Sequence, residues 1–156
     1  MTKTAMSKHL VTALALAAST SCALAEGHVY GAFPELYKQE CASCHTAYPP
    51  ELMTASGWKQ LMGQLDRHFN ADASLDAKTR VSIAGFLAAR ASGREKHAPT
   101  EATGRLTKTA WFVREHGKKA SPGTPLSDCA ACHTNAENAD YSERSLKLPA
   151  SFRQRD

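Results

Sequence analysis

The chain has 156 residues, of which 42% are hydrophobic and 7% aromatic, a length that suffices for one compact domain and is too short for two large ones. Its 19 basic and 15 acidic residues give a formal net charge of +4, which falls to +2 without Lys3 and Lys8 near the N-terminus. Such a weak positive charge indicates neither a nucleic acid nor an anionic membrane as a partner.

The first 25 residues have the three parts of a secretory signal peptide. Two lysines precede a short apolar run at residues 10–18, and Ala-Leu-Ala at residues 23–25 forms a cleavage site. We therefore expect residues 1–25 to be removed and residues 26–156 to be exported to the periplasm of a Gram-negative bacterium. No later segment approaches the roughly 20 apolar residues of a transmembrane helix, so we expect no stable membrane anchor.

Cys22 is the odd member of the five cysteines. In an alternative interpretation, a lipoprotein signal would anchor the chain through this cysteine. Such a signal normally has a leucine three residues earlier, where this chain has Ser19, so we expect Cys22 to be discarded with the signal peptide.

The other four cysteines lie in two copies of the motif Cys-x-x-Cys-His, at residues 41–45 and 129–133. In a c-type haem site the two thiols add to the vinyl groups of the porphyrin, and the histidine that follows binds the iron. Two redox disulfides or one four-cysteine zinc site would be the alternative, but neither explains why a histidine follows both copies. The motifs predict two covalently attached haem c groups, with attachment at Cys41, Cys44, Cys129 and Cys132 and iron ligation by His45 and His133.

Three segments have apolar residues at helical spacing, whereas no strand alternation of useful length occurs. The clearest helix is expected at residues 56–69, with an apolar stripe that includes Trp58 and Leu65. Further helices are expected at about residues 76–91 and at residues 107–116. This pattern predicts a mainly α fold in which short helices and long loops pack around the two haems.

A polar segment at residues 92–104 contains two glycines and a proline, which is typical of a linker. We expect it to join an N-terminal haem lobe, at about residues 26–91, to a C-terminal haem lobe at residues 105–156. Both lobes would belong to one domain. Residues 121–125 are expected to form a loop that leads into the second motif.

The second axial ligand of each iron decides whether a substrate can bind there. His68 follows Leu65 by three residues on the apolar face of one expected helix, and His116 follows Phe112 by four residues near the end of another. Both histidines are therefore predicted to be iron ligands, which gives bis-histidine coordination and low-spin haems of comparatively low potential. The spacing leaves the pairing open: we favour His68 at the first haem and His116 at the second, with the crossed arrangement as the alternative.

Other side chains are weaker candidates for these axial positions. His28 and His97 lie in polar surroundings and are expected to be solvated unless a loop folds over a haem. Met62 lies on the apolar stripe, where packing is the usual role of methionine. Met53 is a further candidate. Binding of a methionine would raise the potential of its haem.

Four segments of the chain carry a resemblance to a known family. They are residues 41–50 (CASCHTAYPP), 56–62 (SGWKQLM), 68–75 (HFNADASL) and 111–116 (WFVREH). With these segments the chain resembles the small dihaem cytochromes c known as DHC over nearly all of its predicted mature length. The resemblance implies a class-I-like dihaem cytochrome c, with histidine ligands at the positions of His68 and His116. The chain departs from the family at residues 70–71, where a glycine-containing turn is expected.

The same resemblance implies a role in electron transport. Members of the family are expected to relay electrons between a membrane cytochrome b and a soluble periplasmic haem protein, such as a monohaem cytochrome or a reductase. We expect a monomeric electron carrier and not an enzyme. The alternatives are a dihaem subunit of a larger periplasmic oxidoreductase and a haem enzyme or gas-binding protein with one open iron.

Charged residues suggest two further contacts. Lys118 and Lys119 could dock an acidic redox partner, although such a pair is more often only solvated surface. Arg67, Arg80 and Arg114 are candidates for neutralising the haem propionates, and the sequence does not select among them.

Overall fold

The computed structural model describes residues 28–117 and 126–148. These residues form α1 (Glu35–Cys41), α2 (Ala55–Met62), α3 (Ala77–Arg90) and α4 (Ala110–His116), with two short strands, β1 (His28–Val29) and β2 (Asp140–Tyr141). Three-residue 3₁₀ helices occur at Pro50–Leu52, Leu65–Arg67, Glu95–His97, Leu106–Lys108, Cys129–Ala131, Ala136–Asn138 and Glu143–Ser145. The predicted mainly α fold is confirmed. The predicted signal peptide, Cys22, Lys118, Lys119 and the loop at residues 121–125 lie outside the described residues.

Helix α2 is shorter than the helix predicted at residues 56–69. It begins after Thr54, whose side chain accepts a hydrogen bond from the Gly57 amide (3.3 Å), and it ends at Met62, directly before Gly63. Glycine weakens a helix, and here the chain leaves the α-helical path and forms a separate 3₁₀ turn at Leu65–Arg67. The prediction was therefore wrong beyond Met62, and the residues that follow this turn belong to a loop.

Helix α3 agrees with its prediction to within one residue. The carboxylate of Asp76 accepts hydrogen bonds from the amides of Lys78 (2.9 Å) and Thr79 (3.1 Å) and so caps the helix N-terminus. With 14 residues α3 is the longest helix in the described part of the chain, and none of these helices is long and apolar enough to cross a membrane. Helix α4 begins at Ala110, three residues later than predicted, because residues 106–108 form a 3₁₀ turn first.

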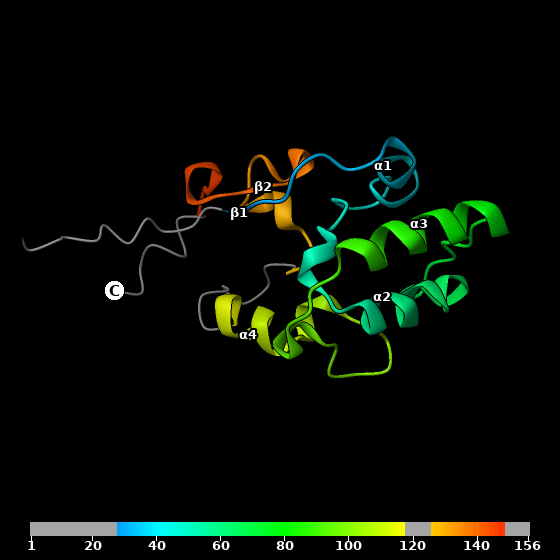
Figure 1. The fold of residues 1–156 in the computed structure, drawn as a ribbon. Coiled ribbons are helices and arrows are strands. Elements are labelled where there is room, and N and C mark those ends of the chain that lie inside the picture. Colours follow the sequence, from blue (N-terminus) through cyan, green and yellow to red (C-terminus); the bar gives the residue numbers. More distant parts are fainter. Residues whose placement is uncertain (1–27, 118–125, 149–156) are drawn as a thin grey trace, which may run out of the picture.

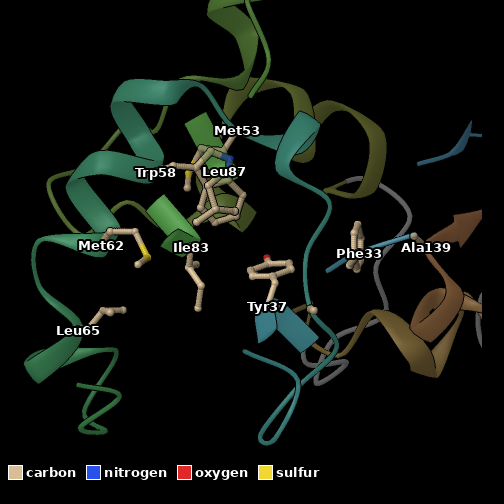
Figure 2. Packing of buried hydrophobic residues seen from close by; sticks show 10 residues of the cluster. Phe33, Tyr37, Met53, Trp58, Met62, Leu65, Ile83, Leu87 and Ala139 are labelled. Carbon is tan, nitrogen blue, oxygen red and sulfur yellow. The ribbon is translucent and has the colours of Figure 1, made fainter. Parts of the chain in front are cut away.

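Helices α1, α2 and α3 lie at one end of the molecule, and α4 with the two strands lies at the other (Figure 1). The main core fills the space between the three helices, where Trp58 of α2, Leu87 of α3 and Tyr37 of α1 converge (Figure 2). The polar atoms of this core have backbone partners. The Trp58 indole donates to the Pro50 carbonyl (2.7 Å) and the Tyr37 hydroxyl donates to the Tyr48 carbonyl (2.7 Å). Both hydrogen bonds hold residues 48–50, which follow the first motif, against the core.

The two strands connect distant parts of the chain. Strand β1 pairs with β2 in antiparallel register, so residues 28–29 of the predicted N-terminal lobe lie beside residues 140–141 of the predicted C-terminal lobe. Arg90, the last residue of α3, also holds the N-terminal segment: it donates to the Tyr30 carbonyl and forms an ion pair with Glu51 (2.8 Å). The strand pairing therefore joins the two halves away from the motifs, whereas the Arg90 contacts lie within the predicted N-terminal lobe. The lobe boundaries remain a prediction.

Replacement of Leu87 by alanine is expected to lower the free energy of unfolding by about 2–5 kcal/mol. The side chain is only 1% exposed, so its loss leaves a cavity in the core. Val81 on the same helix is 70% exposed, and Val81→Ala is expected to change the stability by less than about 0.5 kcal/mol. Denaturant unfolding of the two holoproteins measures the difference, and equal stabilities would contradict the packing described here.

Candidate haem sites

The first motif histidine lies opposite a histidine from a distant loop. The ring centroids of His45 and His68 are 6.2 Å apart. An imidazole nitrogen binds a transition-metal ion at about 2 Å and lies about 1 Å from the centre of its ring, so two imidazoles on opposite sides of one iron have centroids about 6 Å apart. The observed separation therefore matches the space that one iron atom needs.

The second motif histidine has a matching partner on α4. The ring centroids of His133 and His116 are 6.3 Å apart. His116 is the last residue of α4, which Thr109 caps by accepting a hydrogen bond from the Phe112 amide (3.2 Å). The structure thus brings together His45 with His68 and His116 with His133, the pairing favoured from the sequence.

Neighbouring groups orient each of these rings. Nδ1 of His45 lies 2.8 Å from the Thr46 carbonyl oxygen, and Nδ1 of His116 lies 3.3 Å from the Phe112 carbonyl oxygen. When Nδ1 carries the proton and donates a hydrogen bond to a carbonyl, Nε2 is the nitrogen that can bind a metal. The aromatic rings that contact the four histidines are Tyr48 on His45 (4.7 Å), Phe69 on His68 (4.8 Å), Phe112 on His116 (4.1 Å) and Tyr141 on His133 (5.0 Å).

Burial favours the neutral form of two of these histidines. Burial is the main cause of the lowered pKa of His68, and the nearby His45 and Arg105 make smaller contributions. It also lowers the pKa of His133, and His116 adds to this effect. A lowered pKa favours the neutral imidazole, and a histidine must be neutral to ligate a metal.

Comparison with known proteins identifies the kind of site. Residues 37–141 match the sequence profile of the dihaem cytochrome c (DHC) family. The chain belongs to the dihaem cytochrome c family. It therefore binds two covalently attached haem c groups, and membership of this family implies electron transfer.

Solved structures of dihaem cytochromes c have a similar fold. The crystal structure of DHC from Rhodobacter sphaeroides is 37% identical, with a TM-score of 0.61, and the match covers 71% of this chain and 99% of that one. A second diheme cytochrome c structure from the same organism is 36% identical, with a TM-score of 0.63, and covers 71% and 98%. The diheme cytochrome from Shewanella baltica OS155 is 29% identical, with a TM-score of 0.62, and covers 76% and 96%. A search of curated protein sequences gave no significant match.

The thiols of this dihaem cytochrome c differ from those of a redox-active pair. Burial raises the pKa of Cys41 and of Cys129 to about 11. Cysteines that exchange disulfides have a lowered pKa, because the thiolate is the reactive form. Cys41, Cys44, Cys129 and Cys132 form no disulfide with one another, and among residues 28–117 and 126–148 no three His, Cys, Asp or Glu side chains gather to hold a metal ion directly.

Backbone hydrogen bonds within and after the second motif hold His133 in place. The His133 amide donates to the Cys129 carbonyl (2.8 Å), which closes a turn over the motif. Residues 145–147 lie beside the end of this motif. The Lys147 amide donates to the Cys132 carbonyl (2.7 Å), and the Thr134 amide donates to the Ser145 carbonyl (2.9 Å). Backbone contacts on both sides therefore fix the position of this motif.

Tyr48 connects the two haem sites. Its ring stacks on His45 of the first site, and its hydroxyl donates to the Ser127 carbonyl (3.0 Å), two residues before Cys129 of the second motif. Tyr48 was not among the site residues predicted from the sequence. Its position three residues after the motif histidine was the available signal, but the contact with Ser127, 79 residues away, depends on the tertiary fold.

His97 was predicted to be solvated, and this prediction was wrong. Its side chain is only 7% exposed and stacks on Trp111, with ring centroids 4.9 Å apart. The polar segment at residues 92–104 contains a 3₁₀ helix that packs on α4 and carries His97 inward. Of the other candidates, His28 is exposed, whereas Met53 (0%) and Met62 (6%) are buried in the core, where Met62 was expected to pack.

Proposed function

We propose that this dihaem cytochrome c is a periplasmic electron carrier in which two histidines ligate each iron. His45 and His68 would ligate the first iron, and His133 and His116 the second. The observation that supports this proposal best is the separation of the ring centroids, 6.2 Å in the first pair and 6.3 Å in the second. Each separation matches the distance expected for two imidazoles that share one iron atom.

The work of the chain in this mechanism is to hold the ligands in place. The haem supplies one-electron redox chemistry, while the protein sets ligand geometry and electrostatics. A firm histidine on each side excludes substrates from the iron, so electrons would enter and leave through the haem edges. The carbonyl partners of His45 and His116 and the aromatic rings against all four histidines would limit the movement of these ligands.

The location and the partners are proposed from membership of the dihaem cytochrome c family. We propose that the protein is exported through its signal peptide and acts as a monomer in the periplasm. A membrane cytochrome b would donate electrons, and a periplasmic monohaem cytochrome or a reductase would accept them. The low net charge of the mature chain, +2 before the haem propionates are counted, supports brief encounters with proteins more than binding to an anionic membrane.

Carbon monoxide tests the proposed coordination, because it binds ferrous iron only at a vacant or weakly held position. We expect the fully reduced, purified mature protein to show no change in its absorption spectrum when carbon monoxide is added. Binding of one molecule per two haems would show that one distal histidine is not a firm ligand. The haem enzyme or gas-binding alternative would then replace the electron carrier.

A further inference from the structure

An arginine that the sequence analysis did not consider lies beside the first haem site. Cζ of Arg105 is 4.1 Å from the centre of the Phe69 ring, and this ring packs edge-on against His68 with a centroid separation of 4.8 Å. Arg105 directly precedes the 3₁₀ helix Leu106–Lys108, which packs against α4. The contact with Phe69 therefore places a cation from the start of the predicted C-terminal lobe next to a loop 36 positions earlier in the sequence.

Arg105 and His68 contact the same phenyl ring, so the guanidinium belongs to the layer of side chains that surrounds the first site. Arg105 also interacts electrostatically with Tyr48, whose ring stacks on His45. A cation therefore lies near side chains that contact both proposed ligands of the first iron.

Among the residues that the structure describes, Arg105 forms a weak ion pair. Its Nε lies 3.5 Å from the Glu101 carboxylate, and both side chains are 40% exposed. Such a half-exposed pair contributes little to stability. The planar guanidinium offers several N–H donors in a fork that matches a carboxylate, so Arg105 is suited to a second carboxylate. The propionates of a haem are carboxylates at its rim.

We propose that Arg105 binds a propionate of the first haem and raises the reduction potential of that haem. This inference depends on the proposed ligation of the first iron by His45 and His68. A cation near the iron disfavours the more positive ferric state, so it favours reduction. The arginines suggested by the sequence are placed differently. Arg67 is 78% exposed and faces Asp66, Arg114 pairs with Glu115, and Arg80 is exposed.

The test is a redox titration of both haems in Arg105→Gln, with Arg67→Gln as the matched control. We expect the reduction equilibrium of one haem to fall about tenfold in Arg105→Gln, which is about 59 mV for a one-electron couple, and that of the other haem to stay unchanged. Arg67→Gln is expected to leave both haems unchanged, and Arg105→Lys to fall between Arg105→Gln and the wild type. Unchanged potentials in Arg105→Gln, equal shifts of both haems, or an equal effect of Arg67→Gln would overturn the proposal.

The electron paramagnetic resonance spectra of the same samples separate this proposal from the proposed function. Two low-spin signals in the wild type and in Arg105→Gln would support bis-histidine ligation even if neither potential moved. If Arg105→Gln does not yield holoprotein, Arg105→Lys takes its place, because lysine keeps the charge but lacks the fork. We then expect the propionate bending band in its resonance Raman spectrum to shift from the wild-type position. An unshifted band would overturn the proposal.

Discussion

Replacement of His68 by methionine is expected to raise the reduction potential of one haem by more than about 100 mV, within the roughly 0.8 V range over which axial ligands set haem potentials. A thioether is a softer and weaker donor than an imidazole, so it stabilises the ferrous state. His68 lies in a loop opposite His45, and a methionine there points its flexible side chain into the same gap. The haem paired with His116 and His133 is expected to keep its potential.

Redox titration measures this shift, and the optical spectrum shows its cause. We expect the ferric His68→Met protein to gain the charge-transfer band of a methionine-ligated haem. His28→Met is the control, because His28 is exposed in β1 and is not placed opposite a motif histidine. If both potentials of His68→Met equal those of the wild type, His68 is not an iron ligand and the proposed coordination of the first haem fails.

The local signals in the sequence predicted the parts of the fold that local interactions determine. Helix α3 has an N-terminal cap at Asp76 and an apolar face that includes Ile83 and Leu87, and its bounds agree with the prediction. In α2 the apolar stripe continues past the end of the helix, because Leu65 is buried from the following 3₁₀ turn as well. A periodic pattern records which side chains are buried and does not show where the backbone stops being helical.

The prediction that His68 is an iron ligand used a local structure that the chain does not have. It was placed on the face of a long helix, but it follows a 3₁₀ turn, and the next two residues, Phe69 and Asn70, have positive φ angles of 49° and 75°. Asparagine tolerates this left-handed conformation better than most residues, so the chain turns there without the glycine that the family resemblance suggested. The turn brings the ring opposite His45, which no helical spacing could have predicted.

Contacts between distant segments could not be predicted from the sequence. The polarity of residues 92–104 led to the prediction of a linker, and it concealed the burial of His97 against Trp111. The contact of Arg105 with Phe69 and that of Tyr48 with Ser127 each join residues that are far apart in the chain. The motifs predicted the haems, whereas the groups that surround and connect the haem sites depend on the tertiary fold.

Replacement of His116 by glycine is expected to open the second iron without unfolding the protein. His116 is the last residue of α4, and glycine is well tolerated at the end of a helix. The reduced variant is therefore expected to bind one molecule of carbon monoxide per two haems, where the wild type binds none. Added imidazole fits the space of the lost side chain beside Phe112 and is expected to restore the low-spin spectrum and to compete with carbon monoxide.

The control for this variant is Val113→Gly, in the middle of α4. Val113 is 49% exposed, so the substitution weakens the helix by up to about 1 kcal/mol without removing a ring from the haem site. If Val113→Gly also binds carbon monoxide, a general loosening of α4 explains the result and His116 has no special role. If His116→Gly binds none, another side chain holds the sixth position of the second iron. Binding in His116→Gly alone, reversed by imidazole, would identify His116 as the residue that closes the second haem to substrates, as an electron carrier requires.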